Sequence, residues 1–497
     1  MCKNLDRWLG RTAYQIMPDR FCKVGVNPKA MPGRVMKNWD DRMPNWKPNS
    51  EGEYTNDYFY CGNLKGVKSK LNYLRDLGFD MIYLTPITLS NSYHHYDVCN
   101  HMEIDPWLGT WKDFNELCEK AHKLGILIVV DLVFNHAGIS SVYYNNSKYR
   151  EWFKRKPNGE PVFWWGFKDL PECDTLNPYY QQEMLKVATN YLENGADGFR
   201  LDLAENLPKE FLQAIQMVKD KYPNTIVIGE MWGIATDKQD PKILDGQLDS
   251  IMNYPMADGI LRWVRYGEAG HFRYIFDRVF REYPEKVQNL LLNNIATHDT
   301  PTTLTMLGGD IMNANIFDRQ IWDIERPWNS YNGFDTYHFR EYEANHDAIQ
   351  GAEYVKAKVL TQVAIAIMYM LPGIPCIYQG TEVYEMGYKD PFNRKPFNWN
   401  IKEKEMKLFI STMGAIRREH SDVFRDGAVR IVDINEDILI LERFSSDNKR
   451  IILVVNRTPE WKFLHNFFRG VSTKILYSTV NVISGWINEY GIVILRQ

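Results

Sequence analysis

The chain has 497 residues, a net charge of −4 and seven cysteines. A chain of this length buries a large core without disulfides, and without a long run of Lys or Arg it offers no binding surface for nucleic acid. The aromatic content of 14% supplies many Tyr and Trp rings, which can pack a core or stack against sugars.

The N-terminus and the apolar stretches indicate where the protein works. The first residues, MCKNLDRWLGRTAYQIMPDRF, lack the apolar segment and the small-residue cleavage site of a secretory leader. The longest apolar stretch, 363–371, is too short for a bilayer, which needs about 20 residues. The cysteines form no CxxC pair or Cys/His cluster, so no zinc or redox motif is expected. We therefore expect a cytoplasmic protein with no membrane partner.

Apolar, β-branched segments alternate with amphipathic helical patterns along the first 410 residues. The expected strands are 13–17, 81–86, 127–133, 198–203, 226–231, 250–254, 293–297 and 376–379. The clearest helical patterns between them are 67–77, 111–123, 178–194 and 208–221. This alternation predicts an α/β fold, a parallel (β/α)8 barrel. A doubly wound sheet would show a glycine-rich turn after its first strand, and the sequence has none.

Long segments interrupt this pattern after the first strand (27–58), after the third (137–177) and after the strand that leads to Asp299 (310–351). Connections that follow barrel strands leave on the rim where such enzymes carry their active sites. Segment 310–351 carries Trp322, Trp328 and Tyr331. These rings either contact substrate and shape its choice or pack a local helix pair.

The pattern changes beyond residue 410. After one amphipathic helix that runs to His420, the sequence continues with short alternating segments. These segments are 429–434, 438–444, 450–456 and 491–495. They predict a C-terminal all-β sandwich.

Three acids, Asp202, Glu230 and Asp299, each fall where an expected strand ends, in GFRLD, IVIGE and NIATHD. A single acid at a strand end more often caps a helix or forms a surface ion pair. Three acids at the carboxyl ends of parallel strands converge on one rim of a barrel. Two carboxyls about 5 Å apart can cleave a glycosidic bond with retention of configuration. The pattern therefore favours a glycosidase site.

Four motifs stand in the order and spacing of the signature regions of the α-amylase family. They are DLVFNH (131–136), GFRLD (198–202), GEMW (229–232) and THD (297–299). QIMPDRF, YLTPI, HHYD, IDPWLGT, PGIPCIYQGTE and DPFNRKPFNW match further family motifs. From about residue 10 to 410 the chain resembles this family. The resemblance implies a barrel domain A (1–136 and 178–410), an inserted domain B (137–177) and a C-terminal β-sandwich domain C (411–497).

The resemblance assigns Asp202 as nucleophile, Glu230 as general acid/base and Asp299 as the carboxylate that steadies the transition state. Glu230 then needs a raised pKa, from burial and nearby negative charge, whereas Asp202 must ionise. Arg200 lies two residues before Asp202 on the same face of the strand. An arginine inside a strand is costly unless it is paired, so we expect an Arg200–Asp202 ion pair.

The remaining site residues are also implied by the resemblance. His136 and His298 would hydrogen-bond the sugar at the cleaved bond, although a lone histidine is more often a core or surface residue. Tyr96 would stack under the same sugar. Asp390 and Arg394 would close the blind end of the pocket.

Other motif residues bear on structure and metal binding. Asp131 and Asp97 are expected to bond backbone and arginine rather than substrate. Asn135 matches a calcium-ligand position of the family, but Asn206 replaces the histidine that supplies a second ligand. Calcium needs six to eight oxygens, which the sequence does not provide. We therefore predict no required metal or other cofactor.

Departures from the family pattern narrow the subgroup. Residues 203–206, Leu-Ala-Glu-Asn, are closer to the Val-Ala-Asn-Glu of neopullulanases, cyclomaltodextrinases and maltogenic amylases than to the Ala-Ala-Lys-His of secreted amylases. THDTP (297–301) likewise resembles their SHDTP, and LPECD (170–174) replaces the QPDLN of oligo-1,6-glucosidases. The chain starts at the first barrel strand, without the N-terminal β domain through which neopullulanases dimerise. The oligomeric state therefore stays open.

We therefore expect a retaining glycoside hydrolase that cleaves α-1,4-glucosidic bonds of maltodextrins or related α-glucans. A 4-α-glucanotransferase or an α-1,6-acting glucosidase could use the same carboxylates. A non-catalytic relative would lack members of the acidic trio and carry a membrane segment. A metal-dependent barrel enzyme would need a His/Asp/Glu cluster, which the sequence does not show.

Overall fold

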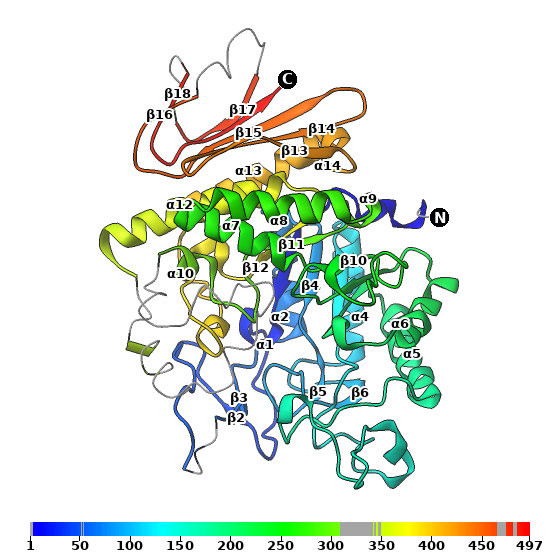
Figure 1. Ribbon diagram of the computed structural model, residues 1–497. Coiled ribbons are helices and arrows are strands. Elements are labelled where there is room, and N and C mark those ends of the chain that lie inside the picture. The colour runs from blue at the N-terminus through cyan, green and yellow to red at the C-terminus, as the bar shows by residue number, and fades with distance from the viewer. Residues whose placement is uncertain are drawn as a thin grey trace.

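The computed structural model describes residues 3–50, 52, 54–308, 341, 344–345, 349–464, 474–480 and 485–497. A parallel barrel forms the body of the molecule, and a C-terminal antiparallel domain covers one of its ends (Figure 1). The predicted (β/α)8 barrel with a C-terminal all-β domain is confirmed. Among the described residues, no helix is both long and apolar enough to span a bilayer.

Eight parallel strands make the barrel, one for each strand expected from the sequence. They are β1 (Ala13–Ile16), β4 (Met81–Leu84), β7 (Leu127–Leu132), β8 (Gly198–Leu201), β9 (Ile226–Gly229), β10 (Ser250–Ile251), β11 (Leu292–Asn294) and β12 (Ile374–Tyr378). Their order is β10-β9-β8-β7-β4-β1-β12-β11. A parallel bridge between Met252 and Leu292 joins the two ends of this order, so the sheet closes on itself.

Alternation along the strands separates two apolar layers. Ala13, Val129 and Ile228 belong to a cluster that fills the barrel interior. Their neighbours in sequence, such as Tyr14 and Val130, belong to the cluster that includes the surrounding helices. Successive strand residues point to opposite faces, which explains why these strands read as continuous apolar runs.

The helices of the barrel follow from local signals. The longest on the first half of the chain are α4 (Trp111–Lys123), which starts with a capping box between Thr110 and Asp113, and α5 (Pro178–Glu193), capped by Asn177 with Pro178 in its first turn. The others are α1 (Pro18–Phe21), α2 (Leu64–Ser69), α3 (Leu71–Asp76), α6 (Lys209–Gln216), α7 (Tyr254–Tyr266), α8 (Ala269–Glu282), α9 (Glu285–Gln288), α10 (Thr303–Gly308), α12 (Gly351–Met370), α13 (Glu405–Glu419) and α14 (Ser421–Phe424).

Two expected helices are divided in the structure. The helix expected at 67–77 becomes α2 and α3, because Lys70 leaves helical backbone angles between them. The helix expected at 208–221 becomes α6 followed by a 3-10 turn over Met217–Asp220. Apolar periodicity continues across both breaks, so it did not reveal them.

Within its described residues, the C-terminal domain contains two antiparallel sheets. The larger contains β13 (Ala428–Ile434), β14 (Ile438–Phe444), β15 (Arg450–Asn456), β17 (Lys474–Ser478) and β19 (Ile492–Arg496), and the smaller contains β16 (Lys462–Phe463) and β18 (Trp486–Ile487). One face of the larger sheet, with Leu439 and Leu453, joins the main core, and the other packs against Leu464 and Ile487. Helix α13 runs across residue 410, and the predicted domain boundaries stay predictions.

The inserted segments gather at the end of the barrel opposite the C-terminal domain (Figure 1). They include β2 (Val35–Met36), β3 (Tyr58–Phe59) and the hairpin of β5 (Thr88–Ser90) and β6 (Val98–Ile104). Segment 137–177 contains two 3-10 turns, Ser147–Trp152 and Trp164–Gly166, and isolated bridges. Most of segment 310–351, with Trp322, Trp328 and Tyr331, lies outside the described residues, so its expected influence on substrate choice stays a prediction.

Candidate active site

Two of the three acids lie side by side at the carboxyl ends of adjacent strands. Asp202 directly follows β8 and Glu230 directly follows β9, and Leu201 pairs with Gly229 in the parallel register. The backbone N–H groups of both acids continue the barrel ladder, donating to the carbonyls of Leu132 and Leu201 at 3.0 Å each. The sheet itself therefore holds both carboxyls at the same height on the rim.

Arg200 joins these carboxyls from within the barrel. Its Nη1 donates to both carboxylate oxygens of Asp131, at 2.8 and 2.9 Å, and to Oδ1 of Asp202 at 2.9 Å. Its Nη2 lies 3.0 Å from Oε2 of Glu230, an ion-pair contact rather than an aligned hydrogen bond. The expected Arg200–Asp202 pair is present, and Arg200 also reaches Glu230. The expected bond between Asp131 and an arginine is present.

Burial dominates the protonation of the two rim carboxyls. It raises the pKa of Glu230, and the nearby charge of Asp299 adds to the rise. It also raises the pKa of Asp202 well above its ordinary value, with a further contribution from Glu230 that Arg200 offsets only in part. We expected Arg200 to keep Asp202 ionised, but one guanidinium serves three carboxyls. Asp202 and Glu230 therefore share protons as a coupled pair.

Backbone and indole donors orient Glu230. Its Oε2 accepts the N–H of Leu203 at 2.8 Å, and its Oε1 accepts Nε1–H of Trp232 at 3.1 Å. Leu203 has a left-handed backbone with φ of 48°, which is costly for a branched side chain. The Trp232 ring stacks on Tyr254 with centroids 3.8 Å apart. The sequence did not predict these contacts, although Trp232 stands in the GEMW motif.

Asp299 lies in a second ion-pair chain on the rim. Nη2 of Arg394 donates to Oδ1 of Asp299 at 3.2 Å, and Nη1 of Arg394 lies 3.3 Å from Oδ2 of Asp390. The Tyr93 hydroxyl donates to Oδ1 of Asp390 at 2.8 Å. Burial raises the pKa of Asp299, and Arg394 opposes that rise. The structure thus brings together Asp299, Arg394 and Asp390.

His298 is held between two strands and the Tyr96 ring. Gln15 Nε2 lies 2.8 Å from Nδ1 of His298, and the Tyr96 oxygen lies 2.5 Å from Nε2. Burial lowers the pKa of His298 well below its ordinary value, so the ring is neutral. Because the Gln15 amide donates to Nδ1, the ring proton is on Nε2. The Tyr96 hydroxyl then donates onward to Asp131 at 2.8 Å.

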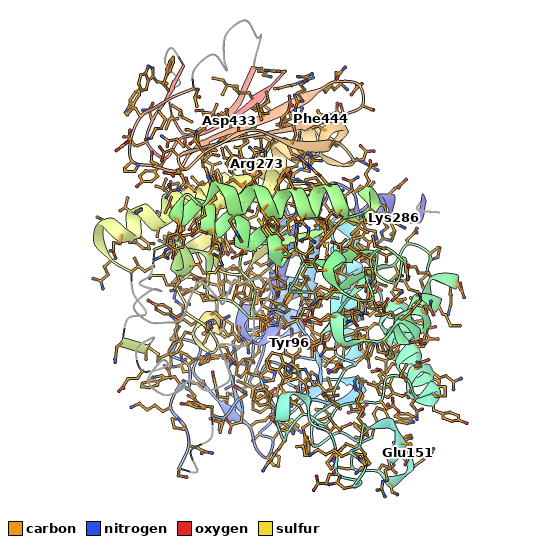
Figure 2. The ribbon with its side chains drawn as sticks, viewed as in Figure 1. Tyr96, Glu151, Arg273, Lys286, Asp433 and Phe444 are labelled. Atoms are coloured by element: carbon orange, nitrogen blue, oxygen red, sulfur yellow. The ribbon has the colours of Figure 1, made fainter. Side chains whose placement is uncertain are left out.

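Tyr96 shows where the candidate site lies in the molecule. Figure 2 shows it in the middle of the view, between Glu151 of segment 137–177 at one end and Asp433 and Phe444 of the C-terminal domain at the other. Gln15 was not expected from the sequence. The feature that could have identified Gln15 is its place in the QIMPDRF motif, on the inward face of β1.

His136 is buried beside this group. Neither ring nitrogen makes a hydrogen bond of good geometry, although the Tyr96 carbonyl lies close enough to oppose the fall in its pKa. Burial lowers the pKa of His136 to about 4, so the ring is neutral. It stacks on Trp164, with centroids 5.1 Å apart. The described contacts link His136 to Tyr96 and Trp164 rather than to the three acids.

The expectation that no metal is required stays a prediction. Nδ2 of Asn135 is buried without a hydrogen bond, and Lys154 Nζ lies 3.0 Å from Oε2 of the nearby acid Glu172. No group of three or more His, Cys, Asp or Glu within the described part of the chain could hold a metal. Asp97 accepts hydrogen bonds from the backbone of Asn91 and Ser92, so its bonds to backbone are present, but no arginine bond to it is found among the described residues.

Comparisons with known proteins identify the family of the chain. The family model "Alpha amylase, catalytic domain" matches residues 15–323, more than half of the chain. Cyclomaltodextrinase from Geobacillus thermopakistaniensis (strain MAS1) is 29% identical over 480 residues, covering 91% of this chain and 70% of that protein. Neopullulanase 2 from Thermoactinomyces vulgaris is 29% identical over 425 residues, covering 82% of this chain and 62% of that protein. The chain thus spans less than two thirds of the second relative.

Solved structures share the fold over nearly the whole chain. The type III pullulan hydrolase from Thermococcus kodakarensis superposes with a TM-score of 0.78 at 23% identity, covering 99% of this chain and 82% of that one. Ttha1563 from Thermus thermophilus superposes with a TM-score of 0.75 at 26% identity, covering 98% of this chain and 99% of that one. The family expected from the sequence motifs is confirmed: the chain belongs to the α-amylase family of glycoside hydrolases.

Proposed function

We propose that this protein is a retaining glycoside hydrolase that cleaves α-1,4-glucosidic bonds of maltodextrins or related α-glucans. The observation that carries the proposal is the placement of Asp202 and Glu230 on one guanidinium, at 2.9 and 3.0 Å, with both carboxyls on the rim of the barrel. A close pair of this kind suits attack by one carboxylate and proton transfer by the other. The names of the relatives, cyclomaltodextrinase and neopullulanase 2, support an α-glucan substrate.

In the first step, the proton shared by the pair is on Glu230. The Asp202 carboxylate attacks the anomeric carbon of the bound sugar, and the bond from that carbon to the glycosidic oxygen breaks. Glu230 gives its proton to the departing oxygen, which leaves as a sugar hydroxyl. Positive charge develops on the sugar as this bond breaks, and it favours the ionised form of Asp202 at that moment.

In the second step, the ionised Glu230 takes a proton from a water molecule, whose oxygen attacks the anomeric carbon. The ester bond to Asp202 breaks, and the sugar leaves with its original configuration. Arg200 supports both steps, because its contacts to Asp202 and Glu230 fix the distance between them. Leu203 and Trp232 aim the two oxygens of Glu230.

The other site residues bind and orient the sugar in this proposal. Asp299 accepts hydrogen bonds from sugar hydroxyls, and Arg394 and Asp390 limit the pocket behind it. His298 and His136 are neutral and can each offer one donor or acceptor. Tyr96 lies parallel to His298, with ring planes 2° apart, and presents an aromatic face to the sugar.

Transfer to a sugar hydroxyl, as in a 4-α-glucanotransferase, and cleavage of α-1,6 bonds would use the same carboxylates. Product analysis with maltotriose, pullulan, cyclodextrin and starch separates these outcomes. We expect maltose and glucose from maltotriose, with no products longer than the substrate. Products longer than maltotriose would indicate transfer. Cleavage of pullulan to maltotriose without panose would indicate α-1,6 specificity. If none of the four substrates gives any product, the proposal is contradicted. A cytoplasmic location stays a prediction.

A further inference from the structure

Three aromatic rings form a continuous stack that leads outward from the site. His136 stacks on Trp164 with centroids 5.1 Å apart and planes 17° apart. Trp164 stacks on Trp165 with centroids 4.9 Å apart and planes 13° apart. Phe167 lies beside Trp164, with its centroid 6.0 Å away. The stack therefore starts close to the carboxyl end of β7 and ends in segment 137–177.

The outer end of the stack is open to solvent. Trp165 is 51% exposed and Phe167 is 52% exposed, although large aromatic rings are usually covered in a folded protein. Polar groups on two residues of the stack also lack partners: Nε1 of Trp164 and both ring nitrogens of His136 are buried without aligned hydrogen bonds. Buried polar groups are normally satisfied, so these groups need a partner that the described protein does not supply.

The backbone of Trp165 is strained. Its φ is 49°, in the left-handed region, which costs free energy for every residue except glycine. The following residue, Gly166, accommodates its own φ of 80° without strain. Strain of this kind gathers at ligand sites, where the surrounding structure maintains it.

We propose that Trp165 and Trp164 form a stacking platform for a glucose unit of the α-glucan chain, at a distance from the bond that is cut. This inference rests on the proposed function. The apolar face of a glucose ring matches the face of Trp165, and the stack on Trp164 holds that face in place. Because the stack continues from His136, a chain bound beside His136 extends along it. The platform therefore affects which substrate length is preferred, and it does not affect the reaction at the cleaved bond.

The test compares Trp165→Ala with Trp165→Phe, using maltohexaose and maltotriose as substrates. We expect Trp165→Ala to lower the ratio of kcat/KM for maltohexaose to that for maltotriose about tenfold, as loss of one stacking contact predicts. Trp165→Phe keeps a ring and should keep most of the ratio. The matched control is Trp461→Ala, because Trp461 is similarly exposed at 46% but lies in the C-terminal domain. An unchanged ratio in Trp165→Ala overturns the inference.

Two further measurements separate this inference from a structural role and from the proposed function. Trp165→Gly relieves the left-handed strain, so its Tm should stay within about 2 °C of wild type while the substrate ratio falls. A large drop in Tm with an unchanged ratio would make Trp165 a packing residue. Calorimetric titration of maltohexaose into Asp202→Asn, with and without Trp165→Ala, measures the platform without turnover. If Trp165→Ala weakens the Kd but the wild-type protein cleaves no α-glucan, the inference stands and the proposed function alone is rejected. An unchanged Kd rejects the inference alone, and no binding of maltohexaose rejects both.

Discussion

Replacing Glu230 with glutamine tests the division of labour between the carboxyls. The amide has the same shape as the carboxyl but cannot donate or take up a proton. Its single oxygen can accept either the Leu203 N–H at 2.8 Å or the Trp232 Nε1–H at 3.1 Å, but not both. One buried donor is left unpaired, which costs about 1–3 kcal/mol. The neutral amide resembles the protonated carboxyl that Glu230 presents in the resting site, so Glu230→Gln should fold.

The expected kinetic loss depends on the leaving group. With maltotriose, whose leaving oxygen needs a proton, kcat/KM should fall by about 10²–10⁴. With an aryl maltoside that has a good leaving group, formation of the glycosyl-enzyme needs little protonation, and its rate should fall less than about tenfold. The basic limb of the pH profile should also disappear, because the group that loses its proton there, Glu230, is gone. Equal losses on both substrates would refute the role of Glu230 as the acid.

Other predictions test the electrostatics and the packing. Burial lowers the pKa of His101 to about 4, whereas an unfolded histidine titrates near 6.5, so its contribution to stability is complete above pH 6.5 and is lost as the pH falls toward 4, by about 3 kcal/mol. His101→Gln should reduce the fall of Tm over this pH range and leave the part due to other buried histidines such as His136 and His298. An unchanged slope would contradict the assignment. Arg443 is buried and donates to the carbonyls of Val423 and Gly427 at 3.0 and 2.8 Å, so Arg443→Ala should cost about 3 kcal/mol in chemical denaturation while kcat/KM of the folded enzyme stays unchanged.

The barrel could be predicted from the sequence because its strands are buried on both faces. Such strands read as apolar, β-branched runs, and helix α4 is marked at both ends by Thr110 and Gly125. The break at Lys70 could not be predicted, because it depends on how α2 packs. Gly66 in α2 lies so close to the Cys22 carbonyl that a Cβ would be 1.8 Å from its oxygen.

The site was predicted in its members but not in its connections. The pairing of Arg200 with Asp202 followed from their spacing along one strand. The sharing of Arg200 with Asp131 and Glu230 depends on strands β7 and β9, which lie far apart in the sequence. A residue spacing carries no information on such contacts. Arg200 lowers the pKa of Asp202, as expected, but burial and Glu230 raise it, and the sequence did not show these opposing effects.

The contribution of segment 137–177 to the site could not be predicted from the sequence either. The aromatic content of the whole chain suggested rings that either pack a core or stack against sugars, and it could not tell these roles apart within this segment. Trp152 is buried, whereas Trp165 is exposed and stacked on Trp164. Both belong to the same polar, aromatic stretch. The left-handed backbone at Trp165 distinguishes it, and no residue pattern reports that angle.

The central claim is that Asp202 forms a covalent bond to the sugar. A fluorinated maltosyl donor, whose glycosyl-enzyme hydrolyses slowly, traps this intermediate for peptide mapping by mass spectrometry. The account predicts one maltosyl group, on Asp202, and no label in Asp202→Asn. A label on Glu230 or Asp299, or turnover of the donor by Asp202→Asn at a rate within about tenfold of wild type, would contradict it.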